Sequence, residues 1–191
     1  MRTVKEPDVR KSEILDGAIV VFAKKGYDRT TISDIAKELK ISQGLCYRYF
    51  SSKEAIYDAA LEKYADLIAE ENRRMADMSL SVKDIIDRVT ASTDYRKAEK
   101  KDEGLYQLFH SKDSRRLHDE LSILVAKKVL PIVSKRLRKA KEEGEIDIED
   151  PEGAAVIGVY GWVGLFMTDG LSDKERLKKM RSAWYTLLNL N

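Results

Sequence analysis

The 191-residue sequence has few of the residues that support catalysis, cross-linking or membrane insertion. Its one cysteine excludes an internal disulfide, and its two histidines, His110 and His118, form no cluster with the spacing of metal ligands. The longest uncharged run, residues 153–168, is shorter than the roughly 20 residues that cross a bilayer. The amino terminus is charged and unlike a signal peptide. We therefore expect a cytoplasmic protein that is not an enzyme and uses no metal or cofactor.

Proline is also scarce, and no segment alternates as a β-strand does, so we expect an all-α fold. Of the three prolines, Pro131 lies inside a predicted helix and should bend it. The predicted helices span residues 9–25, two short stretches within 30–53, and then 52–75, 81–97, 104–110, 115–143, 151 onward and 172–189.

The segment 30–53 predicts two short helices joined by a tight turn. Thr31 and Asp34 have the spacing of a capping box, and Ser42 is a good N-cap for the second helix. One face of the first helix is apolar at helical spacing. This is the pattern of a helix-turn-helix, whose second helix enters the major groove of DNA. The apolar face comprises Ile32, Ile35, Ala36 and Leu39.

The side chains that should face outward from the second helix suit DNA. Gln43 can make a bidentate contact with adenine, and Arg48 with guanine or a phosphate. Leu45 can contact a thymine methyl group, while Tyr47 and Lys53 can bind phosphate oxygens. Two short amphipathic helices also occur in many proteins without DNA ligands, so the spacing alone leaves this function open.

A wider resemblance favours DNA binding. Residues 11–57 resemble the N-terminal domain of the TetR family of transcriptional regulators, most distinctively in the run from Gly44 to Lys53. Two residues depart from the family's usual pattern: Leu45 replaces a small polar residue, and Cys46 replaces leucine. The matching residues are Ile14, Leu15, Ala18, Phe22, Gly26, Tyr27, Thr30, Thr31, Ile35, Ala36, Ile41, Ser42, Gly44, Tyr47, Tyr49, Phe50 and Lys53.

The resemblance implies separate roles for the residues of this segment. Tyr49 is expected to pack in the core rather than to touch DNA. The expected phosphate contacts are Thr30, Thr31, Tyr47 and Lys53. The expected base contacts are Ser33, Gln43, Gly44, Leu45 and Arg48.

Charge is distributed as phosphate attraction would favour. Residues 1–53 carry 11 lysines and arginines against 7 acidic residues, a difference of +4, whereas residues 54–191 carry 24 against 26, a difference of −2. We predict a DNA-binding domain over residues 1–53, with a loose arm at 1–7, and a helical effector-binding and dimerisation domain over residues 54–191.

The predicted helix that starts at Pro151 contains unusual glycines. Three glycines with a spacing of three residues each cost roughly 1 kcal/mol in a helix interior, which close approach of another helix would offset. In the TetR family the last two helices form a four-helix dimer interface, although these glycines could instead serve packing within one subunit. The expected interface residues are Gly158, Gly161, Gly164, Leu177, Met180 and Trp184.

The resemblance also implies a small-molecule cavity in the C-terminal domain. Each residue that could line it is individually more typical of core packing. The expected protein is a homodimeric regulator, a repressor released from a palindromic DNA operator by a small, largely hydrophobic effector. The alternatives are an effector-independent architectural DNA-binding protein and, more remotely, an enzyme on the same scaffold. The candidate lining residues are Thr90, Thr93, Tyr106, Phe109, His110, Leu124, Tyr160, Trp162 and Phe166.

Overall fold

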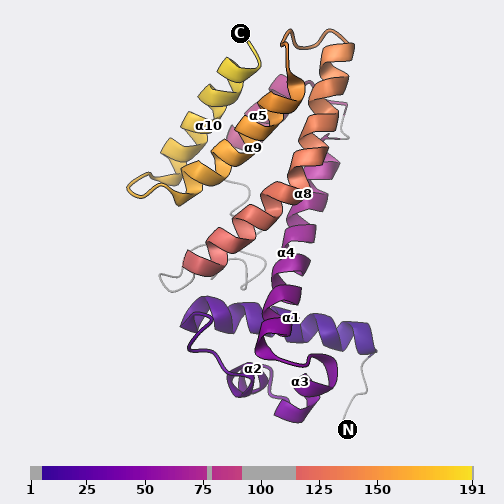
Figure 1. Ribbon diagram of the computed structural model, residues 1–191, viewed down its shortest axis with the longest axis vertical. Coiled ribbons are helices and arrows are strands. Elements are labelled where there is room, and N and C mark those ends of the chain that lie inside the picture. The colour runs from indigo at the N-terminus through magenta and orange to yellow at the C-terminus, as the bar shows by residue number, and fades with distance from the viewer. Residues whose placement is uncertain (1–5, 77–78, 92–114, 191) are drawn as a thin grey trace. The chain divides into compact units, whose positions relative to one another are not determined.

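The computed structural model describes residues 6–76, 79–91 and 115–190, in which every regular element is a helix (Figure 1). The all-α prediction is therefore confirmed for this part of the chain. The predicted helix at 104–110 lies outside the described residues. None of the described helices is both long and apolar enough to cross a membrane. The helices are α1 (Pro7–Lys25), α2 (Ile32–Glu38), α3 (Gln43–Tyr49), α4 (Lys53–Ala76), α5 (Val82–Ala91), α8 (Arg115–Glu142), α9 (Pro151–Met167) and α10 (Asp173–Leu187).

The chain divides into two compact units, and two helices contribute to both. The first unit contains α1, α2, α3, α4 as far as Tyr64, and the start of α8 as far as Leu121. The second contains α4 from Ala65, α5, α8 from Ser122, α9 and α10. The predicted domains, residues 1–53 and 54–191, were defined by function, whereas these units are defined by packing. The predicted domain boundary therefore stays a prediction.

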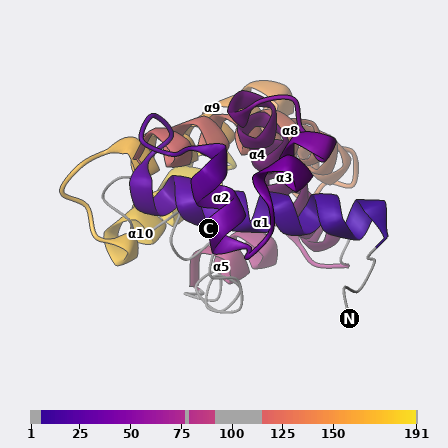
Figure 2. The same cartoon turned by 90° about the horizontal axis from the view of Figure 1, so that it is seen from below.

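The first unit is built around α1. One side of α1 is buried, and α2 and α3 lie on the same side of it, as Figures 1 and 2 show. Gly17 permits a close approach, because a Cβ there would lie 2.6 Å from the side chain of Leu39. Gly26 ends α1 with a φ of 77°, a conformation that glycine adopts without strain. The fully buried side chains of this unit include Ile14, Ile19, Phe22, Ile35, Cys46, Ile56 and Tyr64.

Polar contacts of two residues of α4, Lys63 and Tyr64, hold this helix against α1. Lys63 donates to the side chain of Ser12 over 2.8 Å and pairs with the carboxylate of Asp16. The hydroxyl of Tyr64 donates to the same carboxylate over 3.2 Å. The middle of α4 is therefore held against α1 by polar bonds as well as by apolar packing.

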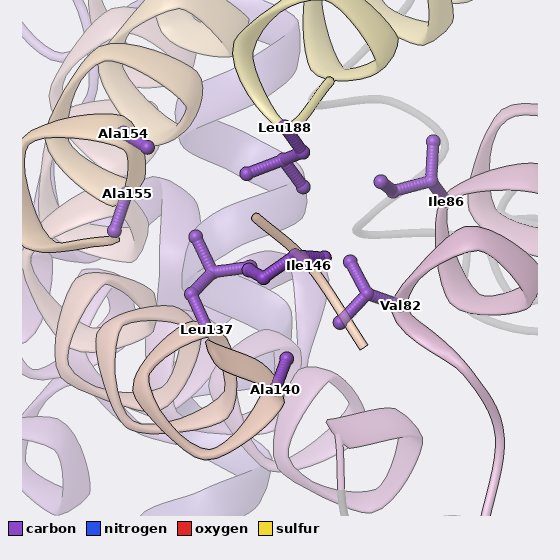
Figure 3. Packing of buried hydrophobic residues seen from close by; sticks show 8 residues of the cluster. All are labelled: Val82, Ile86, Leu137, Ala140, Ile146, Ala154, Ala155 and Leu188. Atoms are coloured by element: carbon purple, nitrogen blue, oxygen red, sulfur yellow. The ribbon is translucent and has the colours of Figure 1, made fainter. Parts of the chain in front are cut away.

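The second unit has a core that draws on four helices. Side chains of α5, α8 and α9 gather with Leu188, which follows α10, around Ile146 in the α8–α9 connection (Figure 3). The helices α9 and α10 lie side by side, and α10 also packs on α5 (Figure 1). Pro131 lies inside α8, which Figure 1 shows to be bent, as proline predicts.

Candidate DNA interface and the exposed face of α9

Short-range hydrogen bonds build the α2–turn–α3 segment as the sequence predicts. The Thr31 hydroxyl accepts from the backbone N–H of Asp34 over 3.2 Å, and the Asp34 carboxylate accepts from the N–H of Thr31 over 3.0 Å. Ser42 caps α3 by accepting from the N–H of Leu45 over 3.2 Å. Each cap satisfies a backbone donor that a helix start leaves without a partner. The capping-box prediction and the N-cap prediction are both confirmed.

The turn between α2 and α3 depends on a strained lysine. Lys40 adopts a φ of 55°, in the left-handed region that disfavours residues with a Cβ. This conformation lets the N–H of Ile41 reach back to the carbonyl oxygen of Ala36 over 2.9 Å. The connection spans residues 39–42, and α3 packs against α2.

The outward face of α3 is polar. Gln43, Tyr47 and Arg48 are exposed, and within the described residues none of the three side chains makes a hydrogen bond or an ion pair. Tyr47 is notable because 52% of this aromatic residue is exposed. Gly44 is also exposed, and a Cβ there would meet nothing within 4 Å. This face therefore offers amide, phenol and guanidinium groups to a partner without first breaking internal bonds.

The remaining residues of α3 divide between core and surface. Cys46 is fully buried, and burial raises the pKa of its thiol. Leu45 and Tyr49 are half-buried, so Leu45 is a less open base contact than its exposed neighbours.

The residues proposed to contact phosphate occupy different environments. Thr30 is buried, and its hydroxyl donates to the carbonyl oxygen of Gly26 over 2.8 Å, so this side chain is not open to a phosphate. Thr31 is exposed at the start of α2, and Ser33 is half-buried within α2. Lys53 begins α4 and donates to the carbonyl oxygen of Tyr27 over 2.8 Å.

Electrostatics also stabilise the start of α2. The Lys25 ammonium donates to Asp34 over 2.8 Å. This bond, together with those from Thr31, lowers the pKa of the Asp34 carboxyl well below its ordinary range. Asp34 is therefore ionised at neutral pH and places negative charge where the positive end of the α2 dipole favours it.

In the second unit, the structure separates the residues expected at a dimer interface. A Cβ at Gly158 would lie 2.1 Å from the ring of Trp184, so this glycine serves packing within the chain. Leu177 and Met180 are buried by the same chain. Gly158, Leu177 and Met180 therefore pack within the chain, and the half-buried Trp184 lies against Gly158. Gly161 and Gly164 are open to a partner, because both are exposed and a Cβ at either would meet nothing within 4 Å.

The outward face of α9 contains apolar residues that the sequence analysis did not single out for this role. Val156, Ile157 and Tyr160 are 45%, 60% and 40% exposed. With Gly161 and Gly164 they form a stripe at helical spacing, which we call the α9 outer face. The uncharged run 153–168 was the sequence signal for this face. A helix that is apolar on all sides is ordinarily buried on all sides, so any side that its own chain leaves exposed is open to a partner.

The candidate pocket residues are only partly described. Thr93, Tyr106, Phe109 and His110 lie outside the described residues. Thr90 is buried, but its hydroxyl already donates to the carbonyl oxygen of Ile86 over 2.7 Å. The other described candidates are more exposed than Thr90. Tyr160 belongs to the α9 outer face, and three are half-buried: Leu124, Trp162 and Phe166.

A capped two-helix unit with an exposed polar face on its second helix is the arrangement of a helix-turn-helix DNA-binding domain. Residues 14–60 match the family model for bacterial regulatory proteins of the tetR family. Over 52 residues the chain is 44% identical to IcaR of Staphylococcus aureus (strain Newman), named as the negative transcriptional regulator of the biofilm operon icaADBC. This match covers 27% of this chain and 28% of IcaR, so the chain matches about a quarter of that relative's length.

The fold extends the similarity to nearly the whole chain. SmeT, the repressor of the Stenotrophomonas maltophilia multidrug efflux pump SmeDEF, superposes with a TM-score of 0.68 at 21% identity, over 94% of this chain and 88% of SmeT. FadR from Bacillus subtilis, a transcriptional regulator in complex with stearoyl-CoA, superposes with a TM-score of 0.67 at 20% identity, over 94% and 98%. The family-model match thus covers about a quarter of the chain, residues 14–60, and the solved structures show that the chain shares the fold of these regulators.

Proposed function

We propose that this protein is a homodimeric repressor that binds a palindromic operator through α3 and is released by a small, largely hydrophobic effector. The observation that carries the proposal is the exposed polar face of α3, where Gln43, Tyr47 and Arg48 have no partner among the described residues. A protein acting on bacterial DNA works in the cytoplasm. The names of IcaR and SmeT, a negative regulator and a repressor, support the sign of regulation.

The proposed contacts fall into two classes that behave differently. Thr31, Tyr47 and Lys53 contact phosphates, which fix the position of the protein but carry no sequence information. Sequence is read by residues that reach the base edges in the major groove. These are Ser33, Gln43, Gly44, Leu45 and Arg48.

The α9 outer face supports a dimer. Three apolar side chains, Val156, Ile157 and Tyr160, are exposed beside two glycines that permit close approach. Against a second copy of the same face they would form a two-fold interface, the commonest symmetry of soluble oligomers. Such a dimer presents two α3 helices, which explains the palindromic operator.

An effector is supported by FadR, whose structure contains stearoyl-CoA, a ligand with a long apolar chain. A ligand that binds the form with wrongly spaced α3 helices lowers operator affinity by its difference in affinity for the two forms. Native mass spectrometry of the purified protein tests for such a ligand. A protein that carries none and whose DNA binding no apolar compound alters would instead be the architectural protein.

Selection of operators from random duplexes, followed by fluorescence anisotropy, tests the DNA assignment. Lys53→Ala should weaken binding to all sequences and reduce the slope of log K against log salt by about 1. Tyr47→Phe should also weaken binding to all sequences alike. By contrast, Gln43→Ala and Arg48→Ala should relax preference at particular base pairs, each worth about 1–3 kcal/mol.

Lys178→Ala is a matched control for Lys53→Ala, since it removes one exposed positive charge from α10 in the second unit. It should leave both the affinity and the salt slope unchanged. If none of the four α3 and α4 variants alters binding, α3 is not the DNA-reading helix.

A further inference from the structure

The loop between α1 and α2 contains an aromatic side chain, Tyr27, that is approached by two cations. The Lys53 Nζ lies 4.2 Å from the ring centroid and donates to the carbonyl oxygens of Tyr27 (2.8 Å) and Asp28 (3.4 Å). Arg116, in the first turn of α8, has its Cζ 5.2 Å from the same centroid and its Nη1 3.9 Å from the Asp28 carboxylate. The lysine proposed to contact DNA and an arginine of α8 therefore contact the same two residues.

Arg116 is itself held in place by α8 and α4. Its Nε donates to Glu120 over 2.8 Å, and the hydroxyl of Tyr57 donates to the same carboxylate over 2.6 Å. Burial alone would raise the pKa of Glu120, but these two bonds outweigh it and lower the pKa, so the carboxylate is ionised at neutral pH. The Tyr57 ring packs edge-on against Tyr27, with centroids 4.7 Å apart. The start of α8 thus contacts the Tyr27 loop directly through Arg116, and indirectly through the bond of Glu120 to Tyr57.

The position of Lys53 depends on this loop. A lysine ammonium has three donors, of which two are directed at the carbonyl oxygens of Tyr27 and Asp28, which leaves one for a phosphate. Binding DNA with a lysine that is already held avoids the loss of rotamer freedom that a mobile lysine would suffer. Movement of the Tyr27 loop would remove that advantage without altering any residue that touches DNA.

We propose that Arg116 and Glu120 are positioning residues for the phosphate contact of Lys53, acting through Tyr27 and Asp28. This inference rests on the proposed function of Lys53 as a DNA contact. It makes the first turns of α8 a determinant of operator affinity. Because α8 continues from this unit into the second one, operator affinity depends on a helix that both units share.

A double-mutant cycle in the full-length protein, measured by fluorescence anisotropy on a selected operator, tests the proposal. Lys53→Ala should weaken binding about tenfold and lower the salt slope by about 1. Arg116→Ala should weaken binding about threefold with the slope unchanged, because Lys53 still reaches the phosphate but is no longer held. In the Lys53→Ala background, Arg116→Ala should change affinity by less than about 1.5-fold.

Two further variants complete the set. Tyr57→Phe keeps the ring but removes the bond to Glu120, and should weaken binding about 1.5-fold, again only when Lys53 is present. Arg73→Ala removes an equal charge from an exposed pair with Glu70 and should have no effect.

Other outcomes overturn the proposal in different ways. Equal losses from Arg116→Ala with and without Lys53 would show a merely structural role. A reduced salt slope in Arg116→Ala would show that the arginine contacts phosphate itself. If the unaltered protein selects no DNA, the proposed function fails, and this inference with it; if it binds but the cycle is additive, only this inference fails.

Discussion

The exposed faces of α3 and α9 differ in their chemistry. On α3 the exposed groups are an amide, a phenol and a guanidinium, all able to hydrogen-bond with water. On α9 they are Val156, Ile157 and the ring of Tyr160, with 60% of Ile157 exposed. Neither face has a partner among the residues that the structure describes, but only the second is unfavourable in water.

This difference in chemistry predicts which face has a transient partner and which has a permanent one. A polar face can be free or bound at little cost, which suits a DNA contact that forms and breaks. An apolar face favours a partner that is always present, and a second copy of the chain is such a partner. We therefore expect a dimer that persists when DNA is released.

The largest expected effect tests this contrast directly. Ile157→Asp places a charge in the middle of the proposed interface, where two copies would meet without a partner. We expect the dimer dissociation constant to rise at least about 100-fold, or about 2.7 kcal/mol. Sedimentation velocity over a range of concentrations measures it.

Leu67→Asp provides the control, because Leu67 is 52% exposed on α4 in the same unit, and α4 contributes no residue to the α9 outer face. It should remain a dimer. If Ile157→Asp is as dimeric as the unaltered protein, the α9 outer face is not the dimer interface. The inference that this apolar face has a permanent partner would then be wrong.

The next effect separates the two sides of α9. Gly158→Ala must displace the Trp184 ring, so it should reduce the free energy of unfolding by about 2 kcal/mol. Gly161→Ala enters open space and should raise it by up to about 1 kcal/mol, since alanine is the better helix former.

Urea unfolding in the Ile157→Asp background measures both changes in a monomer, so that dimer dissociation does not add to the unfolding energy. Equal effects of the two substitutions would contradict the assignment of an inner and an outer side of α9.

The α2–α3 segment was predictable because its signals are local. Thr31 with Asp34, and Ser42 at the start of α3, are short-range patterns in which a side chain bonds to the backbone three residues away. The buried face of α2 followed from helical spacing for the same reason. Leu45 was harder to assign, because half-burial depends on neighbours from other helices.

The sequence of α9 contains no local pattern that shows which of its residues face outward. A helix that is apolar all round has no polar side to indicate which residues face outward, so Gly158 could not be distinguished from Gly161. Only the position of Trp184, 26 residues further on, separates them. Likewise, the burial of Leu177 and Met180 within the chain follows from packing between helices, which periodicity does not reveal.

A smaller effect concerns the charge that stabilises the start of α2. The pKa of Asp34 is lowered from its ordinary value of 3.8, chiefly by Lys25 and then by Thr31. Its ionised form therefore stabilises the fold at pH values above about 4, and this stabilisation is lost as the pH falls further. Asp34→Asn should be less stable than the unaltered protein at pH 7, with a difference that shrinks below pH 4 or so.

Thermal unfolding of both proteins between neutral and acidic pH measures that difference. Glu38→Gln, at the other end of α2 in an exposed pair with Lys24, is the control and should show little effect at any pH. A deficit for Asp34→Asn that is constant with pH would show that the carboxylate acts through its shape alone.

The smallest expected effect sharpens the description of the turn that presents α3. Lys40 is exposed with a φ of 55°, a conformation that is strained for lysine and not for glycine. Glycine also has more freedom to lose on folding, so we expect Lys40→Gly to be stabilising by only about 0.5 kcal/mol. Lys37→Gly is the matched change, since it removes the same side chain from an exposed position inside α2 and should be destabilising by about 1 kcal/mol. If the two substitutions change the free energy of unfolding in opposite directions, the left-handed conformation of residue 40 decides the effect. If they change it in the same direction, the loss of the lysine charge decides it.

A loss of DNA affinity that is common to both variants would measure what these two charges contribute near the polar face of α3. The apolar face of α9 has no such charges to remove.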